Sequence, residues 1–151
     1  MKNTKDLENE LNNIHSEEGV IRFIRKELGT EDFGSYLQKL LDAKKMTIDG
    51  LEIQTTFFGR VSKPMIYASM NGGRTPSKDT VIRLGLGMRA SVDELNTLLK
   101  LAGHKELYAK RKIDALLIYG INQKMTPEEL LNLLSKHNVK GYKLFETKDE
   151  D

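Results

Sequence analysis

Six basic side chains and one acidic side chain fall between residues 60 and 90, which makes this stretch the most unevenly charged window of the chain. The basic side chains are those of Arg60, Lys63, Arg74, Lys78, Arg83 and Arg89. Positive charge gathered in this way attracts polyanions such as nucleic acids. A solvated surface face is the alternative interpretation, because the whole chain of 151 residues has a net charge of only +2.

Patterns typical of enzymes and cofactor sites are weak in this chain. Residues 85–90 match the G-x-G-x-x-A dinucleotide-binding pattern, but they follow a segment with helical spacing rather than a strand. We therefore expect these glycines to permit a close helix contact or to end a helix. Cysteine is absent, and the histidines form no i, i+4 pair of the kind found in metal sites. We expect no enzymatic activity, metal or cofactor; the histidines are His15, His104 and His137.

Helical spacing of apolar residues dominates the chain, and we find neither an alternating strand pattern nor an internal repeat. Ser or Thr residues that can cap a helix precede most of the apolar stripes. Two of them, Ser91 and Thr126, have capping-box spacing to Glu94 and Glu129. Residues 71–73, Asn-Gly-Gly, are typical of a helix end. The expected helix starts are Ser16, Thr47, Ser62, Ser77, Ser91 and Thr126, with a further helix over about residues 109–121.

The N-terminal segment is expected to form a separate helical arm. Leu7, Leu11 and Ile14 are spaced for one face of a first helix, and Ser16 and Gly29 flank a second. The first 15 residues are polar and acidic, which is unlike a secretory signal. No apolar run approaches the roughly 18 residues that a membrane span needs. We therefore expect a cytoplasmic protein without a membrane partner.

The most informative feature is a short helix that begins at Ser62 and is followed by Asn71-Gly72, a basic residue and Pro76-Ser77. It is the third of five short helices expected between residues 31 and 103. The motifs in this region are Phe33-Gly34-x-x-Leu37-x-x-Leu40-Leu41, Met46-Thr47 with Leu51, Val61-Ser62-x-x-x-Ile66, Asn71-Gly72-x-Arg74-x-Pro76-Ser77 and Val81-Ile82-x-Leu84. Together they resemble the helix-turn-helix domain of lambda-type repressors, the XRE family of bacteria and phages. The following segment looks like a helical extension of a subset of these regulators, through Asn96-x-Leu98-Leu99-x-x-Ala102-Gly103, Leu107-Tyr108 and Asp114-Ala115.

The resemblance implies which residues would contact DNA. In this family the second helix spans the DNA backbone, and the third lies in the major groove. Lys63 would then donate to guanine O6 or N7, and Tyr67 would contact a thymine methyl or a phosphate. Ser62, Pro64 and Ala68 would be the other base-facing positions. The remaining DNA contacts implied, mostly to phosphates, are Thr47, Arg60, Asn71, Arg74, Ser77 and Lys78.

The chain departs from the family pattern at the turn between the second and third helices. The usual turn glycine would be at position 56 counted from Leu51, or at position 60 counted back from Ile66, and these residues are Thr and Arg. About four extra residues are therefore present, close to one helical turn. They either lengthen the second helix or displace the third, with Gly59 serving the turn. Pro64 and Ala68 offer no side-chain donors, so shape and phosphate contacts would carry more of the affinity.

The sequence thus predicts an all-α protein of three parts. These are an N-terminal helical arm (1–30), a lambda-repressor-like five-helix helix-turn-helix domain (31–103) and a C-terminal helical extension with a frayed acidic tail (104–151). The predicted function is sequence-specific binding of double-stranded DNA by a homodimeric transcriptional regulator. The arm or the C-terminal helices would supply the dimer contact, and a regulatory protein partner would act on the extension. The alternative is a protein-interaction module, an adaptor or antitoxin-like partner, that keeps the scaffold without DNA readout.

Overall fold

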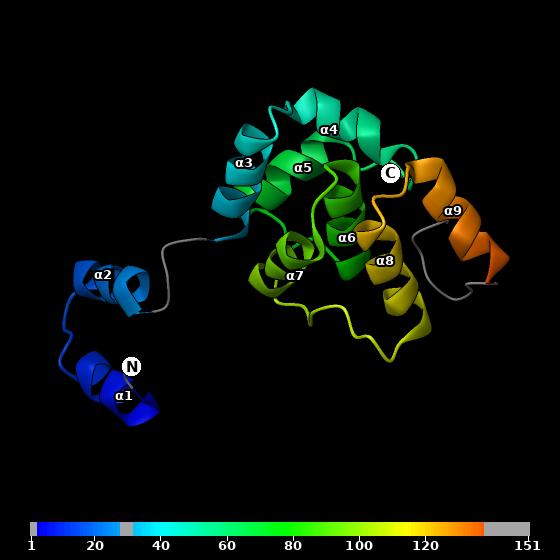
Figure 1. Cartoon of the computed structure of the whole chain (residues 1–151). Helices are drawn as coiled ribbons and strands as arrows, with labels where there is room; N and C mark the ends of the chain where they lie inside the picture. The colour runs from blue at the N-terminus through cyan, green and yellow to red at the C-terminus, as the bar shows by residue number, and fades with distance from the viewer. Residues whose placement is uncertain (1–2, 28–31, 138–151) are drawn as a thin grey trace. The chain divides into compact units, whose positions relative to one another are not determined.

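The computed structural model describes residues 3–27 and 32–137, and within these ranges every regular element is an α-helix (Figure 1). The predicted all-α class is therefore confirmed for the described residues. Contacts divide the chain into two units, residues 1–32 and residues 33–151. Gly29 and the acidic tail, for which a helix end and a frayed segment were predicted, lie outside the described residues.

The N-terminal unit consists of α1 (Thr4–Asn12) and α2 (Glu17–Glu27). Ser16 begins α2 as predicted, because its Oγ accepts a hydrogen bond from the Gly19 N–H at 3.0 Å. The predicted stripe of Leu7, Leu11 and Ile14 is wrong in its last member, since α1 ends at Asn12. Ile14 instead lies against the first turn of α2, next to Gly19. The large apolar side chains that this unit leaves exposed are Leu11, Val20, Ile21 and Ile24.

Five helices follow in the second unit, in the order that the sequence predicts. They are α3 (Phe33–Ala43), α4 (Ile48–Thr55), α5 (Lys63–Met70), α6 (Lys78–Gly87) and α7 (Val92–Leu101). Helix α3 packs against α5 and α7, while α4 packs against α5 and α6. Their inner faces supply a continuous apolar core, which includes Leu37, Leu41, Leu51, Ile66, Ile82, Leu84, Leu95 and Leu98.

Two C-terminal helices extend this core. Helix α8 (Lys112–Asn122) packs against α7 and α9, and α9 is Pro127–Lys136. Helix α8 begins three residues after the predicted position 109, because Arg111 is its extended N-cap. The fully buried Leu117 belongs to the same apolar cluster as the residues of α3 to α7. The extension is therefore packed into the unit, and the predicted boundary at residue 103 falls in the connection between α7 and α8.

The same corner joins three pairs of helices: α3 to α4, α6 to α7, and α8 to α9. Each first helix is followed by a basic residue with a φ of 55–56°. The N–H of the next residue donates to the carbonyl five positions earlier, at 2.9–3.1 Å, which is the Schellman arrangement. A Ser or Thr N-cap comes next, and a buried Leu lies four residues after the cap. The basic residues are Lys45, Arg89 and Lys124, and the buried leucines are Leu51, Leu95 and Leu130.

These corners correct one expectation from the sequence. All three read Lys or Arg, then Met or Ala, then Ser or Thr, any residue, Asp or Glu, any residue, and Leu. The expectation of no internal repeat is therefore wrong at this short scale. The pattern repeats because each end signal, a left-handed residue or a side-chain cap, acts within a few residues of itself. The caps at Ser91 and Thr126 are capping boxes, as predicted.

Glycines permit the closest helix contacts. A Cβ on Gly85 would lie 2.6 Å from Leu95 Cδ1, and one on Gly87 would lie 2.9 Å from Thr55 Cγ2. Both glycines belong to α6, so the dinucleotide-like pattern serves helix packing, one of the two roles expected for it. At Gly34 the neighbour is backbone: α3 touches the last turn of α5 there, and a Cβ would overlap the Met70 carbonyl.

Substitution of Gly34 tests how tightly α3 holds α5. We expect Gly34→Ala to destabilise the protein by about 1–3 kcal/mol in urea unfolding, since a backbone oxygen cannot move aside as a side chain can. Gly72→Ala is the comparison, because its Cβ meets no atom within 4 Å and only the positive φ of 81° is penalised. That variant should lose about 1 kcal/mol. Equal losses would show that the contact with Met70 does not require glycine.

Candidate nucleic-acid interface

Three of the residues predicted to contact DNA cap the helices of the candidate interface. Thr47 Oγ1 accepts from the Gly50 N–H at 2.9 Å and begins α4. Ser62 Oγ accepts from the Met65 N–H at 3.3 Å and begins α5, and Ser77 Oγ accepts from Thr80 N–H at 3.1 Å at the start of α6. The predicted helix starts are thus confirmed. Each hydroxyl is already used as an acceptor. The Ser77 hydroxyl also donates to Thr80 Oγ1 at 3.1 Å, whereas those of Thr47 and Ser62 keep a proton that can be donated to a phosphate.

The connection between α4 and α5 contains the additional residues that the sequence indicates. Helix α4 ends at Thr55 and α5 begins at Lys63, so these residues lie in the connection. Gly59 has a φ of +111° and provides the turn, as predicted. The buried Thr55 hydroxyl donates to the Glu52 carbonyl at 2.7 Å and accepts from the Val61 N–H at 2.9 Å. Thr55 therefore satisfies a buried backbone donor that would otherwise have no partner.

Glu52 of α4 fixes the start of α5. Its Oε2 accepts from the Lys63 backbone N–H at 2.9 Å and from Arg60 Nη2 at 2.8 Å. These bonds, with the Lys63 N–H the larger influence, lower the pKa of Glu52 below its ordinary value despite the opposing effect of partial burial. A carboxylate at a helix N-terminus is also favoured by the helix dipole. Glu52 was missed by the sequence reasoning, yet it links both halves of the predicted helix-turn-helix.

Lys63, the predicted base reader, is paired with an acidic residue of α4. Its Nζ lies 2.6 Å from Asp49 Oδ1, and this hydrogen bond and charge raise the pKa of Lys63. The two side chains are 44% and 69% exposed, so the pair is a surface one that costs little to break. Asp49 and Glu52 lie three residues apart on one helix face, a spacing that could have indicated this acidic pair.

The outer side of α5 is exposed and carries the other predicted base-facing residues. Pro64 and Tyr67 are exposed, Tyr67 by 48%, and Ala68 is half-buried. By helical spacing they share the side of α5 opposite the buried Ile66 and Ser69. Asn71 follows on the same side, where its Oδ1 accepts from the Gly73 N–H at 2.9 Å.

The predicted phosphate contacts differ in their surroundings. Arg74 is exposed and forms no ion pair with the residues that the structure describes. Lys78 is directed to the extension instead, with its Nζ 3.7 Å from Asp114 Oδ2. Asp114 is fully buried in α8, and the same oxygen accepts from the Tyr108 N–H at 2.8 Å. Lys78 therefore also helps to hold the extension against α6.

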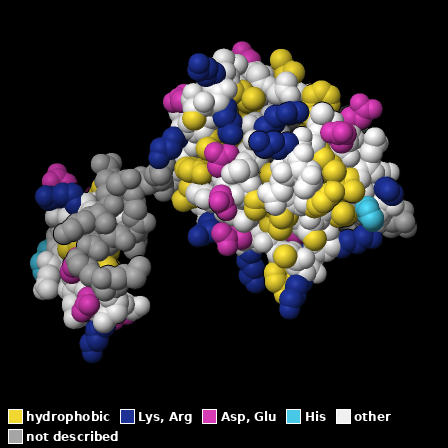
Figure 2. All heavy atoms as spheres, viewed as in Figure 1, with side chains coloured by type: hydrophobic (Ala, Val, Ile, Leu, Met, Phe, Trp, Pro, Cys, Tyr) yellow, Lys and Arg dark blue, Asp and Glu magenta, His cyan; other side chains and the backbone are white. Residues whose placement is uncertain are grey.

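The basic window of the sequence does not form a uniform positive surface in space. Four of its cations face carboxylates, as Arg60 and Lys63 do with α4, Lys78 with Asp114, and Arg83 with Asp79 at 2.8 Å. On the face of the larger unit shown in Figure 2, Lys and Arg side chains are interspersed with acidic and hydrophobic ones. The charge count along the sequence missed this, because Asp49, Glu52 and Asp114 lie outside residues 60–90.

Among the described residues, no group of three His, Cys, Asp or Glu side chains is placed to hold a metal ion. No helix in residues 3–27 or 32–137 is long and apolar enough to cross a membrane. His104 makes a polar contact before α6, with its Nε2 2.7 Å from the Pro76 carbonyl oxygen. Comparison of the chain with protein-family models, curated proteins and solved structures gave no match.

The lowered pKa of Glu52 predicts a pH-dependent stability. The carboxylate is favoured in the folded protein, so its stabilising effect is complete above the ordinary pKa of 4.5 and is lost as the pH falls through the lower folded pKa. We expect Glu52→Gln to unfold at lower urea than the wild type at pH 7, with the difference shrinking below about pH 4. Glu106→Gln, at an exposed position between α7 and α8, controls for the change of charge. A constant difference across this pH range would contradict the assigned role of Glu52.

Proposed function

We propose that α4 and α5 act as a helix-turn-helix pair of the lambda-repressor type, and that the chain binds double-stranded DNA as a dimeric transcriptional regulator. The observation that carries this is the exposed outer side of α5, a short, separately capped helix whose start is held on α4 by Glu52. Eight residues of helix are about 12 Å long, which suits the major groove. The order and packing of α3 to α7 also support the proposal.

DNA binding by this surface involves an exchange of partners. Lys63 must leave Asp49 to reach a base, and Arg60 must leave Glu52 to reach a phosphate. The Lys63 backbone N–H can remain bonded to Glu52 during this exchange. Both ion pairs involve exposed cations, so the exchange costs little in water. Asp49 and Glu52 nevertheless place negative charge beside the DNA backbone, which lowers affinity. Arg74 requires no such exchange among the described residues.

A dimer is proposed because one helix of this length reads few base pairs. The N-terminal unit exposes apolar side chains on α2, namely Val20, Ile21 and Ile24, which are suited to bury against a second copy. A contact through the C-terminal helices is the other arrangement. A cytoplasmic location follows from the proposed role.

The second candidate function is a protein-interaction module, and one observation favours it. Ile53 and Phe57 are 61% and 52% exposed on α4 and the following turn, and Tyr67 is exposed on α5. Three large apolar side chains exposed on α4, on the turn after it and on α5 suit a protein partner, as an adaptor or antitoxin-like protein would need. Because most cations of the region already face carboxylates, an apolar interface here would depend little on salt.

Selection from a random duplex library at near-physiological salt tests the choice. We expect enrichment of a motif with two-fold symmetry that is lost with Lys63→Ala, and an affinity that falls about a thousandfold between 50 and 200 mM salt if some six phosphates are contacted. The absence of an enriched motif with folded protein would favour the interaction module.

Removal of the Asp49 carboxylate tests the proposed competition. Asp49→Asn frees Lys63 and removes negative charge from the interface, so we expect duplex DNA affinity to rise about two- to fivefold in fluorescence anisotropy at fixed salt. Asp93→Asn changes the net charge equally in the first turn of α7 and is the control. An equal rise in DNA affinity in both variants would show that only net charge matters, and that the ion pair with Asp49 does not compete with DNA for Lys63.

A further inference from the structure

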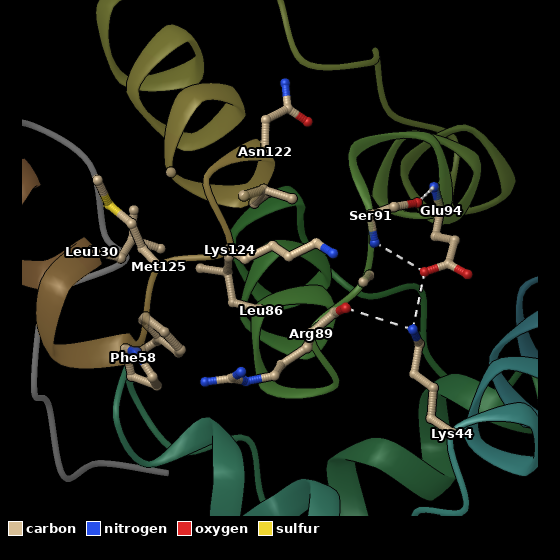
Figure 3. Close-up of a pocket in the computed structure, with 14 residues that line it drawn as sticks. Lys44, Phe58, Leu86, Arg89, Ser91, Glu94, Asn122, Lys124, Met125 and Leu130 are labelled. Atoms are coloured by element: carbon tan, nitrogen blue, oxygen red, sulfur yellow. Dashed lines mark hydrogen bonds and ion pairs between the residues drawn. The ribbon is translucent and has the colours of Figure 1, made fainter.

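A pocket of about 370 Å³ lies where the extension meets the five-helix region (Figure 3). Its apolar lining comes from three places in the fold. Phe58 belongs to the connection between α4 and α5, Leu86 to α6, and Met125 and Leu130 to the corner before α9 and to α9 itself. Phe58, Leu86 and Leu130 are otherwise buried, so the pocket exposes only parts of core residues.

Two cations border this apolar lining. Arg89 and Lys124 are the left-handed residues of two of the repeated corners, and both are exposed. In Figure 3, Arg89 extends from the α6–α7 corner toward Phe58, and Lys124 extends from the α8–α9 corner in the opposite direction, toward Ser91. Neither forms an ion pair with a residue in the described part of the chain.

The other charged groups of the pocket are already partnered. Lys44 Nζ lies 3.1 Å from Glu94 Oε1 and also donates to the Arg89 carbonyl at 3.5 Å. The same Glu94 oxygen accepts from the Ser91 N–H at 2.9 Å within the capping box. The charge of the Glu94 carboxylate is thereby balanced by Lys44, so Arg89 and Lys124 give the pocket a net positive charge.

A cation after a helix is common, because it interacts favourably with the helix dipole. Lys45 meets that description at the third corner, where it does not line this pocket. A left-handed Lys or Arg is also less favourable than the glycine found after α7 at Gly103. What separates Arg89 and Lys124 from Lys45 is that both border one apolar hollow.

We propose that this pocket binds a small organic anion, a carboxylate or phosphate carried on an aromatic or short aliphatic body. The volume lies within the range of small-molecule sites, which combine an apolar lining with a few placed polar groups. The apolar body packs against Phe58, Leu86 and Met125. Arg89 and Lys124 are exposed and can turn toward the anionic group, which they then hold by charge-assisted hydrogen bonds.

A ligand bound in the pocket also affects the candidate DNA-binding surface, because the two share the connection between α4 and α5. Phe58 immediately precedes Gly59 and Arg60, and the Val61 N–H is held by Thr55. A ligand that packs on Phe58 therefore biases the connection that sets the start of α5. Binding of the anion is independent of the proposed function, whereas its effect on DNA affinity rests on that function.

The test is a titration of the full chain, followed by ¹H–¹⁵N NMR, with phenylacetate and octanoate as probes. We expect saturable shifts of the Phe58, Leu86, Arg89 and Lys124 amides. Phenylacetamide, the neutral analogue of phenylacetate, should bind at least about tenfold more weakly. Arg89→Gln and Lys124→Gln should each weaken phenylacetate binding by a similar factor, and because both side chains are exposed the fold should persist. Lys45→Gln is the matched control and should leave binding unchanged.

Several results would overturn the proposal. These are the absence of saturable shifts, equal binding of phenylacetamide, the same shifts with inorganic phosphate alone, or an equal loss in Lys45→Gln. Residues 144–146, Leu-Phe-Glu, carry the same chemistry in this chain. If Phe145→Ser shifts the pocket amides without added probe, the chain's own tail is the occupant and the free-ligand proposal is wrong.

The effect on DNA is measured separately. With the enriched duplex, saturating phenylacetate should change the affinity of the wild type and not that of Arg89→Gln. If the probe binds in the pocket without any change in DNA affinity, only the proposed coupling through Phe58 is wrong, and the pocket assignment stands. A protein that binds the probe and no DNA would overturn the proposed function and leave the pocket assignment standing.

Discussion

The polar contacts that α4 makes with the residues after it are the constraint on which the candidate site depends. Glu52 receives the Lys63 N–H and the Arg60 guanidinium, while Thr55 receives the buried Val61 N–H. A buried N–H without an acceptor costs about 1–3 kcal/mol, and an irregular connection has no helix to supply one. Glu52 and Thr55 of α4 supply these acceptors instead, and together with the Ser62 cap they fix the start of α5. The exposed side of α5 is positioned as a consequence.

The same contacts decide the electrostatics of the surface. A carboxylate that anchors the start of α5 necessarily brings negative charge next to the cations of α5 and its preceding turn. Asp49 adds a second negative charge through its pair with Lys63. Affinity for a polyanion then depends on the exchange of surface ion pairs, and the exposed Ile53 and Phe57 lie near by in the same helix and turn. The two proposed functions, DNA binding and protein binding, would therefore use the same surface and would differ in their dependence on salt.

The C-terminal helices are part of the structural unit that carries this surface. Leu117 and Leu134 are buried with the residues of the preceding helices, and Lys78 reaches Asp114 from the start of α6. The pocket lies along this junction, and Phe58 belongs both to its lining and to the connection before α5. Phe58 is therefore the side chain that connects this junction with the turn before α5.

Local signals in the sequence determined much of the fold. Thr47, Ser62, Ser77, Ser91 and Thr126 all cap the helices expected of them, and Gly59 provides the expected turn, because caps and left-handed turns act within about four residues. The tertiary structure alone decided the partners of the cations. Lys63 meets Asp49 and Lys78 meets Asp114, 14 and 36 residues away, so no local window of charge could reveal them. It also decided that Arg89 and Lys124 border one pocket, since that depends on how two corners pack. Helix caps and turns depend on hydrogen bonds between residues close in the sequence, so the sequence reveals them. Ion pairs and the pocket form only when segments distant in the sequence come together.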